Sequence, residues 1–194
     1  MLPVFLSLLL ALTTSPDQGE PEAHQQSDPT MTLFEFDAPD DAAWQVVNDG
    51  VMGGRSQGYI NIESGVLRFH GTLVTQGGGF TSIRISRAAD LSAYDGVELR
   101  VRGGGRTFEV EVDDGTMRGW RRVSRQAPFE TTPEWTWVRV PFSALGTTVW
   151  GQPVNATPID VASVEAFGFY IVDGIDGPFE LEVEAIRAYR DTTD

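Results

Sequence analysis

Residues 97–113 read VELRVRGGGRTFEVEVD, and their alternation of apolar and charged side chains indicates β-structure. Over 97–102 one face carries Val, Leu and Val while the other carries Glu, Arg and Arg, and residues 108–113 alternate apolar with acidic residues. A period of two is that of a half-buried strand. The glycines at 103–105 predict a hairpin, in which arginines on one strand face glutamates on the other. These charges then have a structural explanation, and we do not count them as a site.

Outward from this stretch, short apolar or alternating runs follow one another along the chain, at 59–62, 66–70, 80–85, 135–140, 167–172 and 179–184. No segment longer than a turn or two has the 3.6-residue period of a helix. The 21 glycines and 11 prolines supply many turns. The sequence therefore predicts an all-β fold, a jelly-roll β-sandwich of two sheets.

The amino-terminal region divides into two parts before the domain. Residues 1–15 contain a short apolar run, too short for a bilayer span of roughly 20 residues, that indicates a secretory signal peptide. Residues 16–31 are rich in Pro, Gln and acidic residues and indicate a disordered linker. The domain is predicted over 32–190. Export would place it in the periplasm or outside the cell, whereas translation from Met31 would make it cytoplasmic. No transmembrane segment is predicted.

The composition limits the chemistry that is available. The formal net charge of −14 repels nucleic acid and anionic membranes at long range, and no nucleic-acid partner is predicted. There is no Cys, every one of the 14 basic residues is Arg, and the two histidines are His24 and His70. A lysine Schiff base and a thiol nucleophile are excluded, so we predict a protein that is not an enzyme.

No cofactor is predicted, although two acidic groups have the oxygen ligands that a structural Ca²⁺ would need. Carboxylates gather at Asp37, Asp40 and Asp41, and again at Asp173 and Asp176. Oxygen ligands suit Ca²⁺, so either group could help to hold a structural calcium ion. Neither group has the spacing of a helix-loop-helix calcium site, and acidic turns without a metal are common.

The loop Asn48-Asp49-Gly50-Val51-Met52-Gly53-Gly54-Arg55-Ser56 is the segment that most suggests function. It superficially resembles a phosphate-binding loop, but it lacks the first Gly and the Lys, and strand-like residues follow it. Its glycines allow another chain to approach closely. We predict partner contacts through a set within this loop: Asp49, Met52, Gly53, Gly54, Arg55 and Ser56. The alternative is that Arg55 pairs with Asp49 and merely closes one end of the sandwich.

Two further groups of residues are candidates for partner contacts. Arg84 follows the glycines at 77–79 and would lie on a sheet face, either ion-paired or on a concave polar surface. Arg118, Arg122 and Trp120 lie in a stretch without acidic residues, which could bind an acidic partner or a glycan. The alternative for these arginines is pairing with the nearby residues Asp113 and Asp114.

In order along the chain, several motifs together resemble the complex I intermediate-associated protein 30 family. They are Trp44 with the loop at 48–56, then GGFTSIR at 78–84, YDGV at 94–97, RVRG at 100–103, WVRVPF at 137–142, Gly168-Phe169, and GPFEL at 177–181. This resemblance implies a galactose-binding-domain-like jelly roll. It also implies a non-enzymatic assembly factor.

We therefore carry two hypotheses of function. The first is a non-catalytic protein-binding module resembling complex I assembly factors or chaperones, whose partner is a respiratory complex subunit or assembly intermediate. The second is an extracytoplasmic carbohydrate-binding module, in which Trp120 or Trp150 would stack on sugar rings.

Overall fold

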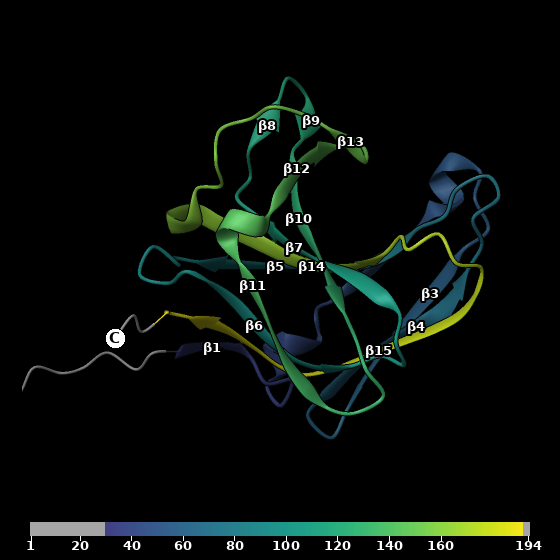
Figure 1. Cartoon of the computed structure of the whole chain (residues 1–194), viewed down its shortest axis with the longest axis horizontal. Helices are drawn as coiled ribbons and strands as arrows, with labels where there is room; N and C mark the ends of the chain where they lie inside the picture. Colours follow the sequence, from purple (N-terminus) through teal and green to yellow (C-terminus); the bar gives the residue numbers. More distant parts are fainter. Residues whose placement is uncertain (1–29, 192–194) are drawn as a thin grey trace, which may run out of the picture.

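Two antiparallel sheets form the body of the protein in the computed structural model, which describes residues 30–191 (Figure 1). Sheet A has the order β11-β6-β15-β4-β3, with β1 also paired to β15. Its strands are β1 (Thr30–Phe34), β3 (Gln57–Glu63), β4 (Val66–Leu73), β6 (Gly96–Arg102), β11 (Thr136–Pro141) and β15 (Gly177–Tyr189). β1 thus begins two residues before the predicted start of the domain at 32.

Sheet B has the order β13-β12-β10-β7-β14-β5-β2. Its strands are β2 (Gln45–Asn48), β5 (Thr81–Ala89), β7 (Thr107–Asp113), β10 (Ser124–Glu130), β12 (Gly146–Val149), β13 (Gln152–Pro153) and β14 (Val164–Ile171). A separate two-stranded ribbon pairs β8 (Met117–Arg118) with β9 (Arg121–Arg122). The helical turns are η1 (Pro39–Ala42), η2 (Asp49–Met52), η3 (Phe142–Ala144) and η4 (Val161–Ser163). The predicted all-β jelly-roll sandwich is confirmed.

The apolar face of each sheet packs against the other, and aromatic rings span the space between them. Phe69 and Phe179 of sheet A lie 5.0 Å apart, and Phe179 contacts Phe108 of sheet B at 6.2 Å. Phe129 and Phe169 continue the contacts within sheet B at 6.0 Å. All five rings are buried, and each buried Phe contributes about 1.5–3 kcal/mol of transfer free energy. The alternation read from the sequence therefore specifies this core.

The predicted hairpin between 97–102 and 108–113 is wrong. β6 pairs with β11 and β15 in sheet A, whereas β7 pairs with β10 and β14 in sheet B. The intervening glycines carry the chain from one sheet to the other: the Gly103 amide donates to the Thr132 carbonyl at 3.0 Å, and Gly104 and Gly105 have φ angles of 65° and 86°. A left-handed backbone of this kind favours glycine.

The charges on β6 and β7 consequently have partners other than one another. Arg100 Nε lies 3.5 Å from Glu184, and Arg102 pairs with Glu182, both across sheet A on β15. The acidic residues of β7 lie instead on the outer face of sheet B. The charges of β6 thus have the structural role expected of them, but those of β7 belong to a different surface.

The predictions for the amino terminus fall mostly outside the described residues. These are the signal peptide over 1–15 and all but the last two residues of the linker over 16–31. Within 30–191 no helix is long and apolar enough to cross a bilayer.

Candidate functional site

The loop at 48–56, called the signature loop below, is organised around the carboxylate of Asp49. This side chain is fully buried. Its Oδ1 accepts from the Ser56 amide at 2.9 Å, while its Oδ2 accepts from the Ser56 hydroxyl at 2.7 Å and from the Gly79 amide at 2.8 Å. Burial alone would raise the pKa of Asp49, but the hydrogen bonds from Gly79 and Ser56 outweigh it and hold the pKa below its ordinary value. Asp49 therefore ties the signature loop to the segment at 77–80.

The glycines around Asp49 are required for this close packing. A Cβ on Gly54 would lie 2.2 Å from the Asp49 carboxyl carbon, and one on Gly78 would lie 2.3 Å from its Oδ2. Gly53 ends η2 with a φ of 87°, a left-handed conformation that other residues adopt only with strain. Gly54 thus serves internal packing and Gly53 serves the backbone conformation, so the loop backbone is held at these two positions.

Arg55 does not pair with Asp49, so that alternative interpretation is wrong. The Asp49 oxygens are occupied by Ser56 and Gly79, and the Arg55 Nη2 donates to Gln76 Oε1 at 2.8 Å. Gly53 and Arg55 are exposed at the loop surface, whereas Asp49 and Ser56 are buried. Asp49 and Ser56 therefore hold the loop in position, and Gly53 and Arg55 form its accessible surface. The side chain of Met52 lies outside the described part of the structure.

A second feature lies on the outer face of sheet B, where Arg84 of β5, Glu111 of β7 and Tyr170 of β14 form what we call the central cluster. The Tyr170 hydroxyl donates to Glu111 Oε2 at 3.0 Å, and the Arg84 guanidinium lies 4.9 Å from the centre of the Tyr170 ring. Arg84 Nε is 3.8 Å from Glu111 Oε2. Gly168 stands opposite both Arg84 and Glu111 in register. Its missing side chain leaves room for these two side chains to cross the strand.

The three members of the central cluster differ in their access to solvent. The Glu111 side chain is 4% exposed, and burial raises its pKa despite the opposing effect of Arg84. Burial also raises the pKa of Tyr170, and the charge of Glu111 adds to the shift. The Arg84 side chain is 42% exposed; its Nε is buried without a hydrogen bond, and its Nη atoms donate none within residues 30–191. Glu111 and Tyr170 thus hydrogen-bond to each other, while the Arg84 guanidinium has N–H groups available to donate to a ligand.

The sequence indicated Arg84 but missed Glu111 and Tyr170. The alternation around Glu111 predicts a hairpin with β6, and the run at 167–172 predicts only a strand for Tyr170. The alternation of β7 does place Glu109, Glu111 and Asp113 on one face. It does not reveal that β14 and β5 bring Tyr170 and Arg84 to that face.

A third feature is an arm at one end of sheet B, formed by the β8–β9 ribbon and the β12–β13 hairpin (Figure 1). Trp120 and Trp150 lie at the turns of these two elements, with exposed fractions of 73% and 65%. Their ring centroids are 5.5 Å apart. The Arg121 guanidinium lies over both rings, at 4.9 Å from Trp120 and 4.2 Å from Trp150.

Two arginines of this region are paired with Asp113 and Asp114, as the alternative interpretation held. Arg122 Nη1 donates to Asp113 at 2.8 Å and also lies 3.4 Å from Glu165. Arg125 is buried and contacts Asp114 at 3.3 Å. Arg118 is exposed and has no ion pair within the described chain. Arg122 therefore fixes the base of the arm, and Arg118 and Trp120 remain accessible.

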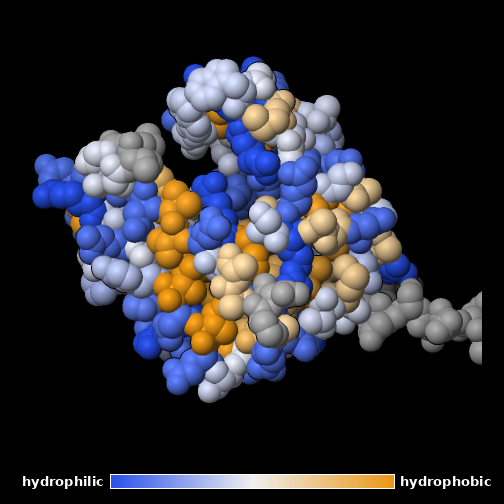
Figure 2. Space-filling view, turned by 180° about the vertical axis from the view of Figure 1, so that it is seen from behind, coloured by the Kyte–Doolittle hydropathy of each residue, from blue (hydrophilic) through white to orange (hydrophobic). Residues whose placement is uncertain are grey.

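Figure 2 shows that the surface is hollowed between the arm and the lobe that contains η2. The structure accordingly places the signature loop and the arm at opposite sides of the hollow. Arg84 is connected to the signature loop through the pairing of β5 with β2: Thr81, three residues before Arg84, is the register partner of Asn48, where the loop begins. The residues predicted to contact a partner thus fall into two groups, the signature loop with Arg84, and the arm.

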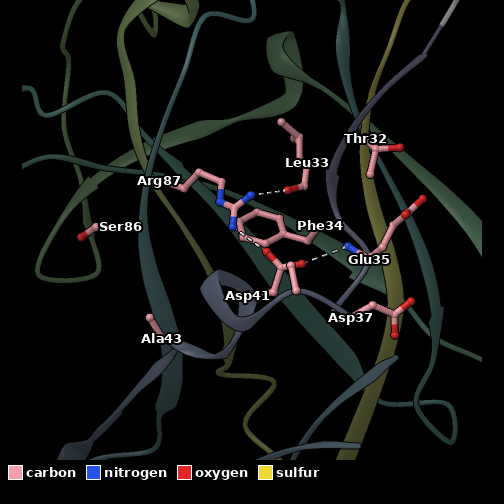
Figure 3. A pocket seen from close by; sticks show the side chains of 10 residues that line it. Thr32, Leu33, Phe34, Glu35, Asp37, Asp41, Ala43, Ser86 and Arg87 are labelled. Atoms are coloured by element: carbon pink, nitrogen blue, oxygen red, sulfur yellow. Dashed lines mark hydrogen bonds and ion pairs between the residues drawn. The ribbon is translucent and has the colours of Figure 1, made fainter. Parts of the chain in front are cut away.

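A cavity of about 710 Å³ lies beside β1, η1 and β5 (Figure 3). Arg87 donates to the Leu33 carbonyl at 2.9 Å and pairs with Asp41, whose Oδ2 accepts from the Phe36 amide at 3.0 Å. Asp41 is thus engaged in tying β1 to β5. Asp173 is likewise paired with Arg106. Among the described residues no three His, Cys, Asp or Glu side chains gather as metal ligands do, and the Ca²⁺ expectation stays a prediction.

A sequence model of the complex I intermediate-associated protein 30 (CIA30) family matches residues 34–183, which is most of the chain. The chain belongs to this family. A mouse protein named complex I intermediate-associated protein 30, mitochondrial, is 28% identical over 94% of the chain, and a Drosophila melanogaster protein of the same name is 25% identical over 81%. The chain covers 63% and 62% of these relatives' lengths. Both names place the relatives in mitochondria, which gives the export prediction no support.

Solved structures with the same architecture confirm the galactose-binding-like fold of this CIA30 family member. The family 11 carbohydrate-binding module of a Clostridium thermocellum cellulase superposes with a TM-score of 0.65 at 14% identity, covering 84% of this chain and 95% of the module. An agarase superposes with a TM-score of 0.59 at 14% identity, over 86% of this chain and 25% of the enzyme. At this identity the likeness concerns the fold alone.

Proposed function

We propose that this CIA30 family member is a non-catalytic module that holds a protein partner against the signature loop and the outer face of sheet B. The relatives are named for intermediates of complex I, so the proposed partner is a subunit or assembly intermediate of a respiratory complex. The observation that carries the proposal is Arg84. Its guanidinium is fixed by Tyr170 and Glu111, its side chain is 42% exposed, and its Nη atoms are free to donate to a partner carboxylate.

The chemistry of this face supports binding without catalysis. The Glu111 carboxyl is buried and accepts from Tyr170, so it is shielded from a substrate. The one histidine among the described residues, His70, lies away from this face and stacks on Tyr59 in sheet A. An exposed Arg among polar and aromatic groups is instead typical of a protein interface.

Affinity capture with matched arginine variants tests the proposal. Arg84→Ala removes the exposed guanidinium of the central cluster, and Arg55→Ala removes that of the signature loop. The control is Arg68→Ala, because the Arg68 side chain is 45% exposed but pairs with Glu180 on the outer face of sheet A. We expect a discrete partner with the wild type and the control, and recovery reduced at least tenfold by Arg84→Ala.

Recovery of no stoichiometric partner would overturn this function. So would equal losses from Arg84→Ala and Arg68→Ala, since the binding face would then not be that of sheet B. Thermal unfolding of each variant shows that a lost partner reflects the surface and not a lost fold.

A carbohydrate-binding module is the second candidate, and the two exposed tryptophans of the arm favour it. Their rings, with the polar groups of the central cluster, are the side-chain types that line sugar sites. One solved structure of the family 11 module contains a β-1,3-1,4-mixed-linked tetrasaccharide. Calorimetry with that tetrasaccharide and a glycan array, each with and without Ca²⁺, test this candidate. No binding in either assay rules it out, and binding insensitive to Trp120→Ala rules out the tryptophan platform.

A further inference from the structure

The arm differs from the rest of the chain in its charge. Of 194 residues 28 are acidic, about one in seven, yet residues 115–129 and 135–159 contain no Asp or Glu. These two segments supply β8, β9, β12 and β13, which are the whole of the arm. The arm therefore carries only positive charge in a protein whose formal net charge is −14.

Two arginines at the end of the arm face each other without a carboxylate. Arg118 and Arg121 are partners in register on the β8–β9 ribbon. Like charges directly opposite on neighbouring strands destabilise the pair. Within residues 30–191 neither forms an ion pair, whereas nine other arginines do, namely Arg68, Arg84, Arg87, Arg100, Arg102, Arg106, Arg122, Arg125 and Arg139. An unfavourable pair kept free of counter-charges indicates an external anion.

The same end of the arm exposes large apolar side chains. Met117, opposite Arg122 on the ribbon, is 51% exposed, and Trp120 and Trp150 at the turns are 73% and 65% exposed. Tryptophan is the residue enriched where a bilayer meets water, because its ring is apolar and its N–H remains polar. Arginine at that depth binds lipid phosphate while its stem lies along apolar groups.

We propose that the end of the arm docks on an anionic lipid bilayer, with Trp120, Trp150 and Met117 in the headgroup region and Arg118 and Arg121 on lipid phosphates. The arm projects from the body as a convex end, which suits a broad, yielding surface better than a peptide groove (Figures 1 and 2). Arg121 already covers a face of each tryptophan ring, which hinders stacking on a sugar but not burial in an interface.

The negative charge of the body opposes this docking only weakly at physiological ionic strength. Charges separated by more than roughly 8 Å are largely screened there. The carboxylates at the base of the arm are also neutralised in part, because Asp113 pairs with Arg122 and Asp114 with Arg125. Long-range repulsion, expected from net charge alone, is thus compatible with local attraction at the arm.

Flotation of the full chain with vesicles tests the proposal. The probes are vesicles of phosphatidylcholine alone and vesicles with a third of phosphatidylglycerol. We expect binding to the anionic vesicles that weakens with salt, with a blue shift of tryptophan emission. Arg118→Gln/Arg121→Gln should reduce the partition coefficient about thirtyfold, as follows from losing two arginines at an anionic surface. Trp120→Ala/Trp150→Ala should remove the shift.

Matched controls come from the outer face of sheet A. Trp137→Ala removes a tryptophan that is 40% exposed, and Arg68→Gln removes an exposed arginine. Both should bind vesicles as the wild type does, and so should Arg84→Ala, which separates this proposal from the protein-binding function. Absence of binding to anionic vesicles at low ionic strength overturns the proposal, as does equal binding by the arm variants. Preferential binding of a polyglutamate peptide would assign the arm to an acidic protein.

Discussion

Replacing Asp49 with Asn tests whether one buried carboxylate holds the signature loop in place. The substitution preserves size, so the packing of Gly54 and Gly78 against this side chain is retained. It converts one carboxylate oxygen into an NH₂ donor. If the remaining oxygen keeps the Ser56 amide, the NH₂ faces the Gly79 amide, which now donates to Oδ2 at 2.8 Å. The Ser56 hydroxyl can turn to the Val74 carbonyl, at 3.2 Å.

The loss is therefore chiefly one charge-assisted hydrogen bond and one buried N–H without an acceptor. A hydrogen bond to a charged group contributes about 1.5–3 kcal/mol, and an unsatisfied buried donor costs about 1–3 kcal/mol. These contributions overlap because both describe the same amide, so we expect Asp49→Asn to lower the free energy of unfolding by about 2–4 kcal/mol at pH 7.

Urea unfolding monitored by fluorescence, as a function of pH, measures this loss. The pKa of Asp49 in the folded protein lies below its ordinary value, so its carboxylate stabilises the fold above the unfolded-state pKa and loses that effect as the pH falls through the folded-state pKa. The difference between the wild type and Asp49→Asn should narrow below about pH 4. A difference under about 1 kcal/mol at pH 7, or one that does not narrow in acid, refutes the role of the Asp49 carboxylate in holding the signature loop. Asp90→Asn, in an exposed turn, is the control.

Three further substitutions probe the sheet B face and the arm. Asp114→Ala leaves buried Arg125 without its counter-charge and should cost about 3–5 kcal/mol in urea unfolding; partial recovery in Asp114→Ala/Arg125→Met identifies the unpaired charge as the cause, and no recovery argues against it. Tyr170→Phe removes the donor to Glu111 and should cost about 1–3 kcal/mol, with a neutral effect as the contrary result. Burial raises the pKa of Glu111, so the folded protein binds this proton more tightly than the unfolded chain does. Its stability therefore falls as the pH rises from the unfolded-state pKa through the folded-state pKa. The stability of Glu111→Gln should therefore rise relative to that of the wild type as the pH increases above about 4, near the ordinary pKa of Glu, and a constant difference would contradict this.

Local patterns in the sequence predicted the strands but not their partners. The alternation at 97–102 and 108–113 is local, and it specifies two half-buried strands correctly. The choice between pairing with each other or joining separate sheets depends on β11, β15, β10 and β14, some of them more than 70 residues away. The incorrect hairpin between β6 and β7 accounts for the charge of Glu111. It therefore gives no reason to expect Glu111 beside Arg84 and Tyr170 in the central cluster.

In the signature loop too, the sequence identifies the important residues but not the contacts that they make. Its glycines and its Asp were recognisable, but Asp49 and Arg55 were expected to contact each other or a partner. The acceptors of Asp49 serve the amide of Gly79 from a segment 30 residues later. Likewise, the proximity of Trp120 and Trp150 follows from two separate turns brought together by β10 and β12. Contacts between segments far apart in the chain are set by tertiary structure, which residue spacing does not encode.

Strand β15 has a consequence for how the protein is made. It spans Gly177–Tyr189 and is the middle of sheet A, where it bonds to β4, β6 and β1. A ribosome delivers it after every other strand of both sheets. Until β15 leaves the exit tunnel, the edges of β4 and β6 that it pairs with are open. The apolar residues Phe69 and Leu99 are then not covered by β15. The nascent chain therefore presents a template for aggregation throughout most of its synthesis. A stop codon placed just before Gly177 would therefore abolish the fold of the whole domain rather than shorten it by one strand.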